Sequence, residues 1–326
     1  MRHTVLLLVL LWLTALVLPA HAVDKPAKPG AIILIVPFTQ GGPTDEIAQA
    51  LAQALATRLQ QKVVVRNVPG AGGILGTEQV AKSRPDGRTL LLSNIGQATS
   101  GALHTGLRYD PVKSFEAIGL VAEVPMTLIG SSRLVAADLK ELRSAMAGTR
   151  PHLTYAHAGA GSASHLCGLM LADALKADLA AVSYPGTAEA LADVTAGRVD
   201  LLCDQTSNTL VPIGVGRVRV FGVTTKARVV ALPNVPTLAE AGLPKFQLAV
   251  WHGLYAAKGT PDADITRLSK ALQGALQAPE FKQKLADLGA VPAAPQAATP
   301  EALRKRLEGD IARLAPLLKR AVPTAK

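Results

Sequence analysis

Aromatic residues are scarce in this sequence, at 3% of its 326 positions. Nucleic-acid bases and quaternary ammonium groups are held against aromatic rings, so the scarcity argues against both kinds of site. Lys and Arg outnumber Asp and Glu by 34 to 24, but the basic residues are scattered and the densest cluster is 304–306. No basic stripe or known motif indicates nucleic-acid binding. The positive excess instead favours the attraction of small anions.

Cysteine is nearly absent too, with Cys167 and Cys203 as the two examples. They are not spaced as metal ligands. Both lie among apolar residues, which favours buried free thiols. A single disulfide is the alternative in an oxidising compartment, because the sequence does not give the distance between the two Cα atoms.

Long hydrophobic runs are limited to one, at Val5–Leu18. The run follows a short basic start and precedes Ala20-His21-Ala22, an A-x-A cleavage site, so residues 1–22 are predicted to be a cleaved signal peptide. A membrane anchor is the alternative interpretation. We therefore expect an exported, soluble, periplasmic protein, and no Cys follows Ala22 to carry a lipid.

Motifs for catalysis, metals and cofactors are missing. The histidines beyond the signal peptide form no H-E-x-x-H or other zinc spacing. Ser162 stands three residues before His165, but its surroundings are not G-x-S-x-G, so Ser162 and Ser164 are interpreted as helix caps or ligand donors. Gly70-Ala71-Gly72 does not extend to a dinucleotide motif, because Leu75 stands where glycine or alanine is needed. We expect no enzyme activity, no cofactor and no metal.

What the sequence does contain is a strand, a glycine turn and a helix start near the beginning of the mature chain. Ile32–Val36 is an apolar run without alternation, typical of a strand buried on both faces of a parallel sheet. Gly41 and Gly42 allow a sharp turn, Pro43 fits the first helical position, and Asp45 complements the helix dipole. Such a junction presents free backbone N–H groups to an anion.

Similar units of strand, small polar loop and helix recur three times in each half of the chain. This alternation with short connections predicts parallel sheets. In the second half, Thr187 is a candidate N-cap for a helix over Glu189–Ala196. A strand over Arg198–Asp204 is expected to end in a polar loop, Gln205–Asn208. One late strand from Trp251, followed by helices, indicates that the chain returns to complete the first domain.

Ligands of such sheets bind beyond the carboxyl ends of the strands. Two facing sheets would therefore gather polar residues around one cleft: Thr44, Asn94, Ser162, Ser164, Thr187 and Asp204. Asp204 has two open interpretations. It either orients neighbouring loops by accepting N–H bonds or binds a ligand ammonium group.

Ten segments, in order along essentially the whole mature chain, carry a family resemblance: Val36–Asp45, Asn67–Gly73, Gly76–Glu78, Arg84–Gly87, Tyr109–Lys113, Thr154–Ala156, Gly161–Ser162, His165–Leu166, Val235–Leu243 and Gly259–Pro261. Together they resemble the Bug (TctC-like) receptors of tripartite tricarboxylate transporters. The resemblance implies a type II periplasmic-binding-protein fold, in which two doubly wound α/β domains close around a central cleft (a Venus-flytrap architecture).

The resemblance also implies a division of the chain. After the signal peptide (1–22) we expect a first domain over 23–123, a second domain over 124–248, and a C-terminal return to the first domain over 249–326. The family's two crossover segments match roughly Val121–Pro125 and Leu248–Trp251.

The ligand site follows from the same resemblance. The loop over Phe38–Asp45 would hold a ligand carboxylate through backbone groups and bridging waters, and the loops at Gly159–His165, Tyr184–Thr187 and Asp204 would complete the grip. The predicted ligand-binding residues are Phe38, Gly41, Gly42, Thr44, Gly73, Asn94, Gln97, Gly161, Ser162, Ser164, Gly186, Thr187 and Asp204.

Four places depart from the family pattern. Gly168-Leu169 replaces Gly-Glu, Tyr184-Pro185-Gly186 replaces Tyr-Lys-Gly, Gln97 stands where His is often found, and Gln205 stands where Asn is common. Since the last three lie near the cleft, selection among carboxylates is expected at four residues: Gln97, Pro185, Asp204 and Gln205.

The function expected from these features is that of an exported solute-binding receptor, monomeric in solution. It would capture a di- or tricarboxylate, an amino acid or an aromatic acid and deliver it to the membrane permease of a tripartite transporter. The alternative is a ligand-sensing adaptor that contacts the periplasmic domain of a two-component sensor kinase.

Overall fold

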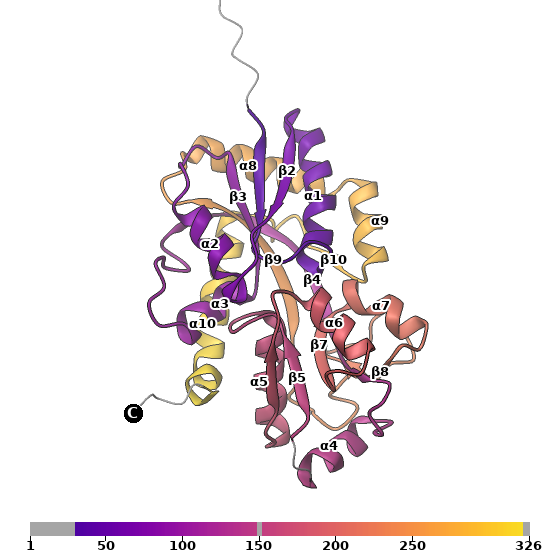
Figure 1. The fold of residues 1–326 in the computed structure, drawn as a ribbon. Helices are drawn as coiled ribbons and strands as arrows, with labels where there is room; N and C mark the ends of the chain where they lie inside the picture. Colours follow the sequence, from indigo (N-terminus) through magenta and orange to yellow (C-terminus); the bar gives the residue numbers. More distant parts are fainter. Residues whose placement is uncertain (1–29, 149–151, 322–326) are drawn as a thin grey trace, which may run out of the picture.

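One continuous sheet runs through both halves of the molecule (Figure 1). The computed structural model describes residues 30–148 and 152–321. Its strands follow the order β2-β1-β3-β9-β4-β7-β5-β6, and β8 and β10 also pair with β4. The predicted signal peptide, 1–22, lies outside the described residues. Within the described ranges, no helix combines the length and apolar character needed to cross a bilayer.

The elements have the following bounds. The strands are β1 (Ile32–Val36), β2 (Val63–Asn67), β3 (Thr89–Asn94), β4 (Phe115–Ser131), β5 (Thr154–His157), β6 (Ala180–Ser183), β7 (Leu201–Gln205), β8 (Val218–Val223), β9 (Ala249–Ala257) and β10 (Val291–Pro292). The helices are α1 (Pro43–Leu59), α2 (Ile74–Ala81), α3 (Gly96–Leu103), α4 (Leu139–Gly148), α5 (Ala163–Leu175), α6 (Thr187–Thr195), α7 (Thr206–Gly214), α8 (Asp262–Leu276), α9 (Pro279–Asp287) and α10 (Pro300–Ala321). A short 3₁₀ turn, η1 (Ala71–Gly73), precedes α2.

The upper half in Figure 1 is built on β1, β2 and β3, which run parallel to one another. Ile32 and Leu34 of β1 are fully buried, as the unalternated apolar run predicts. The stripe Ile47, Leu51 and Leu55 on α1 is also fully buried and belongs to the same core. The sequence pattern therefore gives both the element types and the buried face of the first helix.

The lower half repeats this arrangement with β5, β6 and β7, which are also parallel. β4 and β8 close its other side in antiparallel pairing. In both halves the helices begin just beyond the carboxyl ends of the parallel strands. The fold is thus the two-part α/β architecture that the sequence predicts, with both sets of strand ends directed toward the middle of the molecule.

Two long strands, β4 and β9, join the halves. β4 pairs with β9 as far as Pro125, which lies opposite Ala249, and from Met126 onward it pairs with β7. The partner of β4 therefore changes two residues after the boundary expected at 123/124. The division into domains stays a prediction, but the return of β9 to pair with β3 places the late strand in the first sheet, where the sequence puts it.

The last helix, α10, is fastened to this crossing. Trp251 of β9 donates from Nε1 to Asp310 Oδ2 at 2.7 Å, and Asp310 is 5% exposed. Arg306 pairs with the same carboxylate at 3.1 Å and with Glu123 of β4 at 2.5 Å. α10 also packs against α3 and α5, so it lies along both halves of the molecule (Figure 1).

Two local predictions about helix starts are wrong. Thr187 is the first residue of α6, and the N-cap is Gly186, whose extended backbone leads into the helix. The expected polar loop over Gln205–Asn208 does not form, because Gln205 is the last residue of β7 and α7 begins at Thr206. The Thr209 hydroxyl donates back to the Gln205 carbonyl at 3.3 Å, which lets a polar side chain stay buried inside a helix.

The expectation of free thiols is also wrong. Cys167 of α5 and Cys203 of β7 form a disulfide, with their Cα atoms 6.1 Å apart. Both residues are fully buried, as the apolar context predicts. The context did not show that a helix and a strand 36 residues apart in sequence bring the two side chains face to face.

The disulfide is expected to stabilise the half of the molecule that contains it. Closing a loop of 36 residues removes chain entropy from the unfolded state worth about 3–4 kcal/mol. A Cys167→Ser, Cys203→Ser double variant should therefore lose about that much unfolding free energy in chemical denaturation. Treatment of the wild type with a reductant should approach the same value. A loss well below 1 kcal/mol would show that the bond contributes little beyond packing.

Candidate functional site

The loops at the carboxyl ends of the strands from both halves enclose a small cavity of about 20 Å³. It is lined by Phe38, Thr39, Gly42, Pro43, Thr44, Asn94, Ala158, Ser162, Ala163, Ser164, Thr187, Asp204 and Gln205. The volume is close to that of one water molecule, so a larger ligand enters only if the two walls move apart. Predicted residues from both halves meet here: Phe38, Gly42, Thr44 and Asn94 from one side, and Ser162, Ser164, Thr187 and Asp204 from the other.

Four helices begin at this cavity. The N-caps of α1, α5 and α7 are Gly42, Ser162 and Gln205, and the first residue of α6 is Thr187. All four residues line the cavity. The first N–H groups of a helix lack partners within it and carry the positive end of its dipole. Their convergence makes the cavity suited to an anion.

The first wall is shaped by Asp45. Its Oδ2 accepts the Gly41 N–H at 2.9 Å, and its Oδ1 accepts from Asn67 Nδ2 at 3.0 Å. Asn67 also donates to the Phe38 carbonyl at 3.1 Å. Asp45 is 3% exposed, so it folds the glycine turn onto the start of α1 in addition to complementing the dipole. Because the Gly41 N–H already donates to Asp45, it stabilises the turn and is not available to a ligand.

Thr44 and Asn94 form the floor of the same wall. Asn94 Nδ2 donates to Thr44 Oγ1 at 3.3 Å, and the Gly96 N–H donates to Asn94 Oδ1 at 2.9 Å. His252 of β9 lies behind them, with Nε2 3.2 Å from Thr44 Oγ1. The sequence analysis missed His252, because it stands within an apolar strand and its contact is 208 residues away.

The second wall is built around the start of α5. Ser162 Oγ accepts the His165 N–H at 3.2 Å, which confirms the interpretation of Ser162 as a helix cap. Ser164 Oγ lies 3.1 Å from Ser162 Oγ and accepts the Ala158 N–H at 2.9 Å. Both hydroxyls thus face the cavity while also holding the loop between β5 and α5.

Asp204 ends β7 and is 1% exposed. Its Oδ1 accepts the Gln205 N–H at 2.8 Å, and its Oδ2 accepts from Asn208 Nδ2 at 2.5 Å. Burial raises the pKa of Asp204 to about 6, although hydrogen bonds from Asn208, Gln205 and Thr187 oppose the shift. Both oxygens are engaged by protein donors, which favours the interpretation that Asp204 orients neighbouring loops.

The cavity is electrostatically unusual for an anion site. Among the described residues that line it, none is Lys, Arg or His, and Asp204 is the ionisable one. An anion bound here would rest on neutral N–H and hydroxyl donors and on helix dipoles. The excess of basic residues acts from the surface at longer range.

Five predicted residues lie outside the cavity lining: Gly41, Gly73, Gln97, Gly161 and Gly186. Gln97 is 2% exposed and donates from Nε2 to the Pro111 carbonyl at 3.0 Å. Gly73 lies against the Phe38 ring, since a Cβ on Gly73 would be 3.2 Å from Phe38 Cζ. Gly186 leaves room for Thr39, because a Cβ on it would lie 2.0 Å from Thr39 Oγ1. A direct role of these residues in ligand binding stays a prediction.

Contacts outside the cavity also hold the two halves together. Thr39 Oγ1 donates to Glu189 Oε2 at 3.2 Å, and Thr99 Oγ1 donates to the Gly161 carbonyl. His104 Nε2 lies 2.9 Å from the Ala160 carbonyl oxygen. Gly72, at φ +67°, comes so near the opposite loop that a Cβ on it would lie 1.9 Å from the same oxygen. Only glycine allows this approach.

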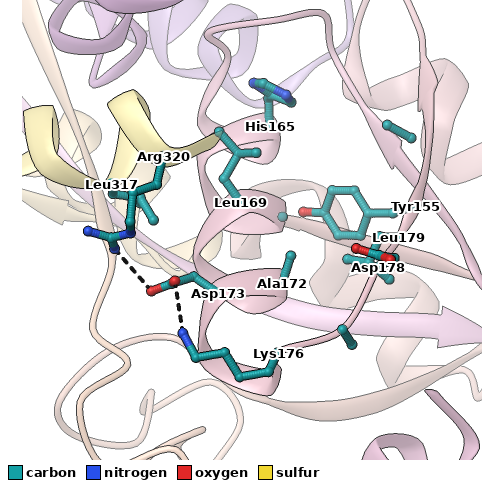
Figure 2. Close-up of a pocket in the computed structure, with 13 residues that line it drawn as sticks. Tyr155, His165, Leu169, Ala172, Asp173, Lys176, Asp178, Leu179, Leu317 and Arg320 are labelled. Carbon is teal, nitrogen blue, oxygen red and sulfur yellow. Dashed lines mark hydrogen bonds and ion pairs between the residues drawn. The ribbon is translucent and has the colours of Figure 1, made fainter. Parts of the chain in front are cut away.

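A larger hollow of about 570 Å³ lies apart from this cavity, between α5 and α10 (Figure 2). Asp173 accepts there from Lys176 at 3.1 Å and from Arg320 of α10 at 3.3 Å. Most of the residues that line it are half-buried, and His165 is the member that comes from the predicted site region. The Arg320–Asp173 ion pair therefore links the C-terminal end of α10 to α5 of the second half.

Comparison with known proteins agrees with this geometry. The family model described as "Tripartite tricarboxylate transporter family receptor" matches residues 47–320. This chain belongs to that receptor family. A relative from Agrobacterium vitis, "UPF0065 protein in the TAR-I ttuE-ttuC' intergenic region", is 43% identical over 312 residues and covers 95% of this chain and 90% of its own.

Solved structures resemble the receptor over nearly its whole length. The periplasmic binding protein BugD has a TM-score of 0.86 and 41% identity, covering 89% of this chain and 97% of its own. MatC from Rhodopseudomonas palustris, solved with bound malate, has a TM-score of 0.86 and 35% identity, covering 89% of this chain and 99% of its own. The predicted family and fold class are thereby confirmed.

Gly72→Ala is expected to hold the two walls of the receptor apart, because the added methyl group would overlap the Ala160 carbonyl. Small-angle X-ray scattering should show a larger radius of gyration. Gly106→Ala is the matched control, since Gly106 has φ +82° but nothing within 4 Å of an added Cβ. Both variants carry a left-handed backbone cost of about 1–2 kcal/mol. Identical scattering from the two would contradict the expectation.

Asp204→Asn is expected to stabilise the receptor at high pH more than at low pH. A carboxyl whose folded pKa lies above its ordinary value of 3.8 loses stability as pH rises from about 4 through 6, because its charge stays buried. Asn carries no charge, so its advantage at pH 8 is at most about 3 kcal/mol and shrinks toward pH 5. Thermal unfolding at both pH values measures the difference, and a difference independent of pH would exclude a raised pKa.

Proposed function

We propose that this receptor binds a small carboxylate in the cavity between its two halves and delivers it to the membrane permease of a tripartite transporter. The observation that carries the proposal is the convergence of four helix starts on one buried, cation-free cavity. Helix N-termini and neutral hydroxyls hold carboxylate oxygens without a salt bridge. The bound malate of MatC, a relative at 35% identity, supports the same ligand chemistry.

Capture is proposed to occur by closure of the two halves. The cavity as it stands holds about 20 Å³, so the walls separate for ligand entry and close on it afterwards. The strand crossing at Pro125 and Ala249 is the natural place for this motion, because few backbone segments connect the halves there. Closure then removes the ligand from water, which strengthens its hydrogen bonds.

The ligand class is proposed from the charge of the walls. Neutral donors on the α1 side suit one carboxylate group. Asp204 on the other side disfavours a second full negative charge placed directly against it, since like charges at close range repel. The ligand's far end therefore meets a mixed surface of Asp204, Gln205 and Thr187, and a hydroxyl, ammonium or amide group suits it best.

Binding without chemistry is the proposed mode of action. Ser162 Oγ caps α5, and His165 Nδ1 accepts the Gly161 N–H at 3.2 Å, so the two side chains do not form a nucleophile and base. Burial and the neighbouring His157 and His104 lower the pKa of His165 to about 4, which keeps it neutral. The proposed location is the periplasm, in line with the predicted signal peptide and the receptor family.

A cognate carboxylate is expected to raise the melting temperature of ligand-stripped receptor. At 100 times its dissociation constant it adds about 2.7 kcal/mol of unfolding free energy, or roughly 5 °C for a chain of this size. The panel should contain malate, succinate, aspartate, citrate and benzoate at pH 7. Malamide, which keeps the malate skeleton without its charges, is the matched control.

No shift with any acid would overturn the proposed ligand class, and an equal shift with malamide would overturn the role of the carboxylate. Deletion of the gene should abolish uptake of the same acid by cells, which tests delivery to a permease. Uptake at the normal rate would contradict delivery while leaving binding intact.

A further inference from the structure

His252 is a buried histidine with one partner in the ligand cavity. It stands on β9 opposite Asn94 of β3 and is 0% exposed. Its Nε2 lies 3.2 Å from the hydroxyl of Thr44, which lines the cavity. Its Nδ1 is buried without a hydrogen-bond partner in the part of the chain that the structure describes. No role in the site is predicted for this residue from the sequence.

The imidazole ring is neutral. Burial lowers the pKa of His252 to about 3, although the nearby Val250 carbonyl opposes the shift. A neutral imidazole has one N–H donor and one bare nitrogen acceptor. The position of its single proton decides what Thr44 does, because the two nitrogens have different surroundings.

The unpaired nitrogen indicates where the proton lies. A buried N–H without an acceptor is rarer and more costly than a buried lone pair without a donor. The Val250 carbonyl makes no hydrogen bond to Nδ1, which has no partner among the described residues, so the favourable tautomer carries its hydrogen on Nε2. That hydrogen is then donated to Thr44 Oγ1.

Thr44 receives a second donor from Asn94. The orientation of the Asn94 amide is fixed, because the Gly96 N–H donates to its Oδ1 at 2.9 Å. Its Nδ2 group therefore faces Thr44 Oγ1, at 3.3 Å. A hydroxyl oxygen has two lone pairs and one hydrogen. With both lone pairs filled by His252 and Asn94, Thr44 has its own hydrogen left to offer.

We propose that His252 is a positioning residue that fixes the Thr44 hydroxyl as a hydrogen-bond donor aimed into the ligand cavity. The inference rests on the proposed function, since it makes Thr44 a donor to a carboxylate oxygen. In the opposite tautomer, Thr44 would donate to His252 and would present no hydrogen to the ligand. The proton on His252, 208 residues from Thr44 in sequence, thus favours a ligand that places a hydrogen-bond acceptor against Thr44.

The tautomer can be measured directly on the full-length mature protein. Long-range ¹H–¹⁵N correlation spectra of ¹⁵N-histidine-labelled receptor distinguish protonated from bare ring nitrogens. We expect His252 to show a protonated Nε2 and a bare Nδ1 at pH 7. A protonated Nδ1 would overturn the inference. This measurement needs no substitution and no ligand, so it stands even if a variant fails to fold.

A double-mutant cycle tests the link to binding, with malate as the probe in isothermal titration. His252→Phe and Thr44→Val are each expected to weaken malate binding roughly tenfold, as the loss of one hydrogen bond to a charged group would. The double variant should be no weaker than Thr44→Val alone, because His252 acts through that hydroxyl. If the double variant lost affinity by the product of the two single-variant factors, the result would contradict a positioning role for His252.

His152→Phe is the control, because His152 lies on the second half away from the cavity and should leave malate affinity unchanged. The outcomes separate the two proposals. If malate and the other acids fail to bind while Nε2 is protonated, the proposed ligand is wrong and the hydrogen-bond arrangement stands. If malate binds and Nδ1 is protonated, the ligand stands and the role of His252 is wrong.

Discussion

The backbone ladder between β4 and β9 is the interaction on which the rest of this structure depends. It extends from Phe115 to Pro125 of β4, and from Met126 onward the same strand pairs with β7 of the other half. β4 therefore belongs to both halves, so the position of one set of loops relative to the other is set where its partner changes from β9 to β7. α10 reinforces it, because Asp310 and Arg306 contact Trp251 and Glu123 on the two strands. The crossing holds the two walls in register.

The cavity offers partial positive charge without a cationic side chain among the residues that line it. Four helix starts and several hydroxyls supply partial positive charge, while the one acid, Asp204, is held by donors from Gln205 and Asn208. A neutral donor set costs less to bury away from water than a lysine or arginine would. It also allows release, since no full ion pair has to be broken. This suits a receptor that must give up its ligand.

The sequence predicts most of the elements and the first wall of the site for definite reasons. The apolar run Ile32–Val36, the glycine turn and the stripe on α1 follow period and propensity, which are local properties. Ser162 as a cap follows from its place before a helix. The N-cap of α6 was misplaced by one residue, because an extended glycine serves as a cap as readily as a threonine.

What the sequence by itself determined is therefore most of the strands and helices, the buried face of α1, and the family to which the chain belongs. Only the tertiary structure decided which side chains meet. The Cys167–Cys203 bond, the burial of Gln97 against Pro111 and the contact of His252 with Thr44 all join residues from separate elements. Such pairings depend on sheet register and helix docking, and these are fixed by the packing of the whole chain, which no local pattern contains.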